Sequence, residues 1–330
     1  ETVVQNCGAV GKTIELINAA QESFIEWKNF KLGKRLEIIE KIKSNLVLKK
    51  MDCAYKITEE MGKPIKESIA EIEKCVLLCD YYIENGDKFL KDEIIKTDAT
   101  KSYVSFEPLG VILGIMPWNF PFWQVFRFVI PAILSGNTTM LKHASNVSGC
   151  CLMIEEIFSY QIDCKTFYSL LLPSSKINHV IKDPIIKAIS LTGSEKAGSS
   201  VGSIAGSEIK KILLELGGAD AFIVCKDADL IKASKKAVLA RMLNAGQSCI
   251  AAKRFIVHKD IKEDFINNII KILDDMKVDD PSDTATQIGP LARIDILSDL
   301  KNQINDALNK GAKLRYQMNG IPSNGYFFPP

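Results

Sequence analysis

Residues 110–116 read Gly-Val-Ile-Leu-Gly-Ile-Met, and this apolar stretch is the first of several β-type runs that decide the fold. The other runs cover residues 137–142, 167–172, 186–191 and 221–225. Helix-like patterns fill most of the gaps between them. Strands that are mostly apolar and alternate with helices are typical of a parallel sheet covered by helices on both faces. The sequence therefore predicts an α/β fold built on a parallel sheet.

The segments on either side of this region have other patterns. Before it, apolar residues at three- and four-residue spacing predict helices over residues 18–29, 32–50, 52–61 and 64–85. Residues 101–107 alternate like a half-exposed strand. A second α/β segment starts near Leu216 and runs to residue 330, with no low-complexity linker before it.

The composition is that of an ordinary globular protein, with 330 residues, 47% hydrophobic and 25% charged. This length favours two domains or one large α/β domain. A net charge of +2 gives no electrostatic reason to expect a nucleic acid or an acidic membrane surface as partner. The most apolar stretch, residues 108–141, is interrupted by prolines, Asn119 and Arg127. We therefore predict neither a nucleic-acid partner nor a membrane span.

The nine cysteines favour a reducing compartment. Their number is odd and no signal peptide precedes them, which predicts a cytoplasmic protein without a disulfide framework. Cys75 and Cys79 share a helical face at i, i+4, but no histidine or second cysteine pair lies at zinc spacing. Helix packing is the better interpretation of this pair, and we predict no metal site.

Cys249 lies where a nucleophile would be expected. Residues 244–254 read Asn-Ala-Gly-Gln-Ser-Cys-Ile-Ala-Ala-Lys-Arg, between a helix-like run over residues 230–243 and a strand-like run over residues 254–258. A thiol in such a turn has rigid flanks and can be reached by a ligand, as reactive cysteines require. A small buried hydrophobe is the alternative that the turn alone leaves open.

Two further segments carry groups suited to catalysis. Glu215 lies in the segment Leu213-Leu-Glu-Leu-Gly-Gly. Apolar surroundings would raise the pKa of its carboxyl group towards neutrality, which suits a general base. A structural ion pair is the alternative. Asn119 lies in Pro117-Trp-Asn-Phe-Pro, between prolines that fix the backbone. Its amide could donate to a developing oxyanion, although a rigid buried loop would have the same sequence.

A possible phosphate site follows the strand at residues 186–191. There Gly193 and Ser194 close the strand and a helix opens at once, so backbone N–H groups could hold a phosphate of a dinucleotide. The alternative is a serine that only caps the helix. No Gly-x-Gly-x-x-Gly follows any strand, so an ordinary Rossmann phosphate loop is missing.

Taken together, these segments resemble the motifs of the aldehyde dehydrogenase family. Five occur in the family's order: Pro117-Trp-Asn-Phe-Pro, Leu141-Lys, Leu191-Thr-Gly-Ser, Leu214-Glu-Leu-Gly-Gly and Gly246-Gln-Ser-Cys. The resemblance spans essentially the whole chain. Phe122-Trp-Gln-Val-Phe-Arg-Phe, Lys142-His-Ala-Ser-Asn and Cys249-Ile-Ala-Ala-Lys-Arg-Phe are most similar to the succinate-semialdehyde dehydrogenase branch.

The resemblance implies a domain plan. A parallel-sheet dinucleotide-binding domain would comprise residues 1–92 and 108–216, a β oligomerisation arm residues 93–107, and an α/β catalytic domain residues 217–330. It also implies a homodimer or homotetramer. Family chains continue beyond the point where this sequence stops, so we expect the C-terminal part of the catalytic domain to be absent from it.

The resemblance also implies the chemistry. Cys249 would attack the aldehyde, Asn119 and the Cys249 backbone N–H would hold the oxyanion, and Glu215 would activate water to hydrolyse the thioester. Members that pass the acyl group to coenzyme A or phosphate generally lack this glutamate, so we expect a carboxylic acid as product. The expected cofactor-binding residues are Trp118, Asn119, Lys142, Ser145, Gly193, Ser194 and Leu216.

Cofactor and substrate follow from two positions. In the family a glutamate three residues after the Lys142 position favours NAD; here Ser145, a neutral donor near a positive charge, tolerates a 2′-phosphate. We therefore predict NADP, with NAD as the alternative. Arg127 matches a position that holds the distal carboxylate of succinate semialdehyde, but a second such arginine is Leu243 here. Another aliphatic or hydroxy aldehyde stays open as substrate, as does a non-enzymatic scaffold with this fold.

Overall fold

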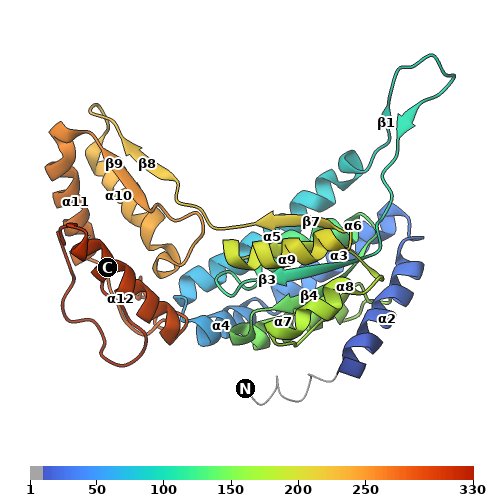
Figure 1. The fold of residues 1–330 in the computed structure, drawn as a ribbon, viewed down its shortest axis with the longest axis horizontal. Coiled ribbons are helices and arrows are strands. Elements are labelled where there is room, and N and C mark those ends of the chain that lie inside the picture. Colours follow the sequence, from blue (N-terminus) through green and yellow to red (C-terminus); the bar gives the residue numbers. More distant parts are fainter. Residues whose placement is uncertain (1–9) are drawn as a thin grey trace. The chain divides into compact units, whose positions relative to one another are not determined.

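A computed structural model describes residues 10–330, which divide into two compact units (Figure 1). Unit 1 comprises the described residues up to Cys53 together with Ala70–Leu216. Unit 2 comprises Ala54–Ile69 and Gly217–Pro330. One division between the units falls after Leu216, and residues 54–69 pack within unit 2.

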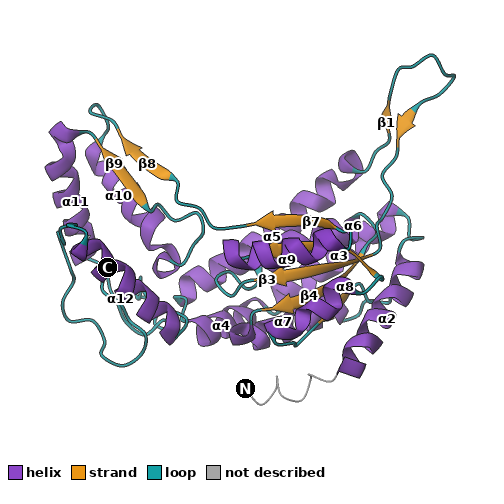
Figure 2. Ribbon diagram, in the orientation of Figure 1, coloured by secondary structure: helices purple, strands orange, loops and turns teal. Residues whose placement is uncertain are grey.

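Unit 1 is built on a five-stranded sheet in the order β5-β4-β3-β6-β7, and all its neighbouring strands are parallel. Figure 2 draws strands as orange arrows, with β3, β4 and β7 of this sheet labelled. The strands are β3 (Val111–Met116), β4 (Thr138–His143), β5 (Phe167–Ser169), β6 (Ile186–Thr192) and β7 (Lys211–Glu215). The predicted parallel sheet is thus confirmed. Strand β7 was not predicted, and β5 ends three residues earlier than expected.

Helices cover both faces of this sheet. On one face α2 (Val10–Trp27), α8 (Ile177–Lys182) and α9 (Glu195–Ser207) bury an aliphatic core with alternate strand residues such as Leu113 and Met140. On the other face lie α6 (Trp123–Leu134) and α7 (Ser148–Ser159), with the rings of Phe126, Phe158 and Phe167 in contact. Gly114 permits this packing, because a Cβ there would lie 2.4 Å from the ring of Phe128.

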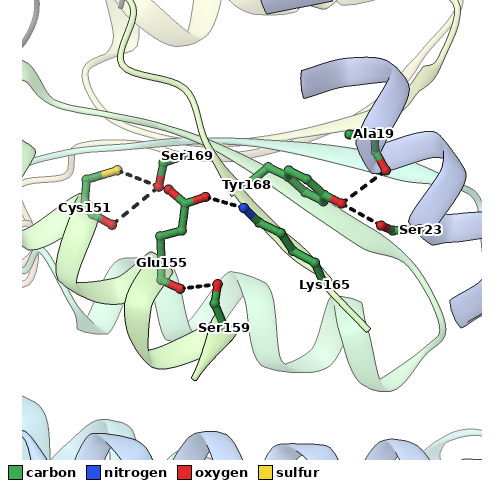
Figure 3. Close-up of polar contacts among 8 residues, drawn as sticks. All are labelled: Ala19, Ser23, Cys151, Glu155, Ser159, Lys165, Tyr168 and Ser169. Carbon is green, nitrogen blue, oxygen red and sulfur yellow. Dashed lines mark hydrogen bonds and ion pairs between the residues drawn. The ribbon is translucent and has the colours of Figure 1, made fainter. Parts of the chain in front are cut away.

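Strand β5 illustrates how the two faces alternate (Figure 3). The Tyr168 hydroxyl reaches α2, donating to the Ala19 carbonyl at 3.1 Å and lying 2.6 Å from the Ser23 hydroxyl. The next residue, Ser169, faces α7, where its hydroxyl lies 3.4 Å from the Cys151 sulfur. A period of two residues along a strand produces this alternation.

The remaining helices of the first 90 residues agree with the periodicity. They are α3 (Leu32–Leu48), which packs on α6 and α7, α4 (Lys50–Met61) and α5 (Ile65–Phe89). The expected strand over residues 101–107 is mostly wrong. Only β2 (Tyr103–Val104) forms there, paired antiparallel with β1 (Glu93–Ile94), and both are exposed. A hairpin without a further sheet to pack on is marginal, which explains its short ladder.

Unit 2 contains the expected second α/β segment. Strands β8 (Ala221–Val224) and β9 (Arg254–Val257) pair in parallel around α10 (Leu230–Met242), with α11 (Lys262–Asp274) and α12 (Ile294–Asn309) following. Its core is centred on Val224, Ala237 and Phe265.

Residues 54–69 join unit 2 through close backbone contact. The N–H of Ile65 donates to the Pro281 carbonyl at 2.8 Å. A Cβ on Gly289 would lie 2.1 Å from the Gly62 carbonyl oxygen, so no larger residue fits there. Over the described residues 10–330, none of the helices combines the length and the apolar character needed to cross a membrane.

Candidate active site

The loops that carry most of the predicted residues share one edge of the unit 1 sheet. Parallel strands end at the same edge, and the ladder pairs Met116 with His143, Ile115 with Leu191 and Thr192 with Glu215. From β3 the chain moves outward to β4 and β5, and then crosses to β6 and β7 on the other side. The carboxyl ends of β3 and β6 therefore flank a topological switch point, where open α/β sheets bind ligands.

The Asn119 loop follows β3 and is held at its far end by His143. His143 contacts the backbone through both ring nitrogens: Nδ1 lies 3.0 Å from the Ala144 nitrogen and 3.2 Å from the Met116 carbonyl oxygen, and Nε2 lies 2.9 Å from the Pro121 carbonyl oxygen. Burial lowers the pKa of His143 to about 4, and the ring is neutral at physiological pH. The loop is half-buried over residues 117–120, and His143 is an anchor that the sequence did not indicate.

Glu71 fixes the residues that follow this loop. Its Oε1 accepts the N–H groups of Phe122 and Trp123, both at 2.9 Å, where α6 begins. A carboxylate is favourable at a helix start because the first N–H groups have no intrahelical acceptor and the helix dipole is positive there. Nothing in the sequence distinguishes Glu71 from a solvated residue of an amphipathic helix.

Lys142 and Asn146 provide polar groups at the end of β4. Lys142 is buried, its Nζ donates to the His143 carbonyl at 2.9 Å, and burial lowers its pKa. Ser145 is exposed at the start of a short 3-10 helix, η1 (Ser145–Val147). Within the described chain, the two buried amide atoms of Asn146 have no hydrogen-bond partner. Buried polar atoms are seldom left in this state, so a polar ligand fits here.

The loop after β6 has the form of a helix cap. Ser194 is the N-cap of α9, and its Oγ accepts the N–H of Ala197 at 3.2 Å. The capping alternative is therefore realised, while the preceding N–H groups of α9 still lack an intrahelical acceptor. Gly193 donates its N–H to the Glu215 carbonyl at 3.0 Å. Leu216 packs over Gly198, where an added Cβ would lie 2.7 Å from it.

The setting of Glu215 differs from the buried one expected. Its side chain is 50% exposed, and its Oε2 lies 3.6 Å from the Arg127 guanidinium, which is 37% exposed. Arg127 also donates to the Thr192 hydroxyl at 3.4 Å. The expectation of desolvation was wrong because β7 is an edge strand of the sheet formed by the described residues and is mostly exposed. The ion-pair alternative describes this carboxylate better.

Cys249 lies on an exposed turn of unit 2, as predicted. Of the eight described cysteines, it and Cys225 are exposed, while the other six are buried and all are free thiols. Burial raises the pKa of Cys53 and Cys79 to about 12, which makes such thiols poor nucleophiles. The alternative of a buried Cys249 is wrong.

The backbone before Cys249 is strained. Asn244 (φ 55°), Ala245 (φ 52°) and Gly246 (φ 79°) are consecutive left-handed residues in the 3-10 segment η3 (Leu243–Gly246). This conformation costs roughly 1–2 kcal/mol for each residue with a Cβ. Asn244 is fully buried, and its N–H donates to Oε2 of Glu67 at 2.7 Å. The predicted catalytic residues thus occupy well-defined places in their own units: Asn119 and Glu215 in unit 1 and Cys249 in unit 2.

Comparison with known proteins identifies the family. The model of the aldehyde dehydrogenase family matches residues 4–330. The chain belongs to the aldehyde dehydrogenase family. Its relatives within that family include proteins named succinate-semialdehyde dehydrogenase, so the resemblance seen in the motifs is confirmed.

Three of these aldehyde dehydrogenases illustrate the similarity. A probable succinate-semialdehyde dehydrogenase [NADP(+)] of Synechocystis is 45% identical over 95% of this chain and 69% of that protein. The Mycobacterium avium succinate-semialdehyde dehydrogenase [NADP(+)] is also 45% identical, over 84% of this chain and 60% of that protein. The crystal structure of succinic semialdehyde dehydrogenase from Streptococcus pyogenes in complex with NADP+ superposes with a TM-score of 0.94 at 32% identity, covering 98% of this chain and 71% of that one. The chain thus spans only part of the length of each.

Proposed function

We propose that this aldehyde dehydrogenase oxidises succinate semialdehyde to succinate with NADP. The observation that carries the proposal is the exposed Cys249 thiol on its strained turn, because strained backbone of this kind is found at functional sites. The names of the relatives support the same substrate and cofactor.

The residues at the carboxyl edge of the unit 1 sheet fit a dinucleotide. The amide of Asn146 would gain partners, and Trp118, Lys142, Ser145, Gly193, Ser194 and Leu216 are the proposed contacts. When bound, the nicotinamide supplies the hydride acceptor of the reaction. Ser145 supports NADP over NAD because a neutral hydroxyl does not repel a 2′-phosphate.

The protein's own residues account for the remaining steps. The Cys249 thiolate adds to the aldehyde carbon, and the Asn119 amide and the Cys249 N–H donate to the oxyanion that forms. Loss of hydride from that carbon leaves a thioester on Cys249. Glu215 then takes a proton from a water molecule, whose oxygen adds to the thioester carbonyl and releases the acid and the thiolate.

Arg127 is proposed to bind the distal carboxylate of the substrate. It now has a competing partner, since the Glu215 carboxylate already lies 3.6 Å away. Exposed ion pairs are worth only about 0–1 kcal/mol, so a second carboxylate can displace Glu215. Binding of an acidic aldehyde would then separate Glu215 from Arg127. A neutral aldehyde would leave the pair intact.

The hairpin β1–β2 supports a homodimer or homotetramer. Its apolar side chains are largely exposed, among them Ile94, Tyr103, Val104 and Phe106. Exposed apolar residues on a short unsupported hairpin favour pairing with another chain. We propose residues 93–107 as the oligomerisation arm, unit 1 as the cofactor-binding part and unit 2 as the catalytic part. The free cysteines support a reducing, cytoplasmic location.

The test is a panel of aldehydes assayed with NADP and NAD, using the intact protein and Cys249→Ala. We expect succinate semialdehyde with NADP to give the highest kcat/KM, and Cys249→Ala to be inactive while still binding NADP. Equal rates for aliphatic or hydroxy aldehydes would overturn the substrate assignment. Activity that survives in Cys249→Ala would overturn the mechanism.

A further inference from the structure

We infer that Glu67 is a positioning residue for the cysteine turn, which we define as residues 244–249. Glu67 lies in the first turn of α5, 177 residues before Asn244 in the sequence. The inference rests on the proposed function only in that the turn carries the nucleophile. The contact itself is independent of any reaction.

The contact joins a carboxylate to the first residue of the strained run. The Asn244 N–H donates to Oε2 of Glu67 at 2.7 Å, and the Asn244 side chain is fully buried. Hydrogen bonds to an ionised acceptor are short and about twice as strong as neutral ones. The bond is therefore well placed to select one backbone conformation at Asn244.

The turn needs such a restraint because its backbone is intrinsically unfavourable. Ala245 has φ 52° and ψ 32°, although its Cβ disfavours left-handed geometry. Residues in sparsely populated regions stay there only when their surroundings over-determine them. On the C-terminal side of the turn, the Gln247 N–H donates to the Asn244 carbonyl at 3.0 Å. The Gln247 Oε1 accepts the Ala292 N–H, also at 3.0 Å. Glu67 supplies the restraint on the entering side.

Glu67 can serve as a fixed point because the start of α5 is itself anchored in unit 2. The Ile65 N–H is bonded to Pro281, and Gly62 lies in backbone contact with Gly289. The helix start that carries Glu67 is therefore held by other parts of unit 2 at Ile65 and at Gly62. Without the Glu67 carboxylate, the left-handed backbone of residues 244–246 would relax. The Cys249 thiol would then be exposed in its reactive orientation for a smaller fraction of the time.

The test uses hydrogen exchange in the intact protein, which requires no catalysis. In Glu67→Leu we expect the Asn244 amide to exchange roughly tenfold faster, because its acceptor is gone. Glu67→Gln keeps an acceptor oxygen and should stay near the unmodified rate. Glu73→Leu is the matched control, since Glu73 lies exposed on the same helix. Unchanged exchange of Asn244 in Glu67→Leu would overturn the contact.

The second readout is the rate of the first turnover. In single-turnover experiments with the protein in excess over the aldehyde, we expect formation of reduced cofactor to slow about tenfold in Glu67→Leu, with KM for the aldehyde nearly unchanged and Glu67→Gln restoring the rate. Alkylation of exposed Cys225, with the buried cysteines unreactive, shows that each variant is folded. Should Glu67→Leu not fold, Glu67→Asp, which withdraws the carboxylate by one methylene, takes its place.

The two readouts separate the inference from the proposed function. Faster exchange with an unchanged single-turnover rate would make Glu67 merely structural and overturn its positioning role. If the unmodified protein formed no reduced cofactor with any aldehyde, the proposed function would fail, and the exchange of Asn244 would still decide whether Glu67 holds the turn.

Discussion

The guanidinium of Arg127 lies 3.6 Å from the carboxylate of Glu215, so the proposed substrate anchor and the proposed general base are partners in the absence of substrate. Both side chains are well exposed, which limits the strength of the pair. The two roles are therefore compatible if the substrate carboxylate replaces Glu215 at Arg127.

Replacing Arg127 by Ala should weaken binding of acidic aldehydes only. Loss of a charge-assisted bond to a carboxylate is worth about 1.5–3 kcal/mol, so KM for succinate semialdehyde should rise roughly 10- to 100-fold. For a neutral aldehyde of similar length, KM and kcat should change by no more than about twofold, because the exposed pair with Glu215 contributes little. Steady-state kinetics with both aldehydes measure this. An unchanged KM for succinate semialdehyde would remove Arg127 from the substrate site.

Glu215→Gln should separate the two halves of the reaction. The amide cannot take a proton from water, so hydrolysis of the thioester should become rate-limiting. We expect a burst of about one equivalent of reduced cofactor per thiol, followed by turnover slowed roughly 100-fold or more. Stopped-flow absorbance resolves the two phases, and mass spectrometry should find the acyl group on Cys249. Full steady-state turnover in this variant would assign the base elsewhere.

Asn119→Ala tests the oxyanion donor. A single donor of this kind typically contributes about 10²–10³ in kcat, and we expect a loss of that size. Cofactor affinity, measured by calorimetry, should stay within about threefold, because the backbone of the loop is fixed independently by His143 and Glu71. Near-normal turnover would contradict the role of this amide.

The parallel sheet could be predicted because strands β3 to β6 are apolar along their length and separated by helices. Strand β7 could not, since its exposure follows from its place at the sheet edge, which depends on the strand order and not on local pattern. The same tertiary effect made the expected burial of Glu215 wrong.

The residues proposed for catalysis could be singled out from local sequence, whereas the residues that hold them could not. Cys249 and Asn119 lie in glycine- or proline-marked turns, and Glu215 ends β7 just before two glycines, so local sequence carries the signal. Glu67 and Glu71 are helical carboxylates, and periodicity alone cannot distinguish them from a solvated face. Their partners lie 177 and 51 residues away, so only the folded chain reveals the contacts.

The lowered pKa of His143 predicts how the stability of unit 1 depends on pH. Its folded pKa is about 4, below the ordinary value of 6.5, because burial disfavours the charged ring. The unfolded chain therefore binds more protons between these values, and stability is full above about pH 6.5 and falls as the pH drops towards 4. The expected loss of unfolding free energy is about 3 kcal/mol.

Denaturant unfolding of the intact protein across this pH range should show the loss, and His143→Gln should flatten the pH dependence. His179→Gln is the control, because that histidine is exposed and should leave the pH dependence in place. A slope that persists in His143→Gln would place the titrating group elsewhere in the molecule.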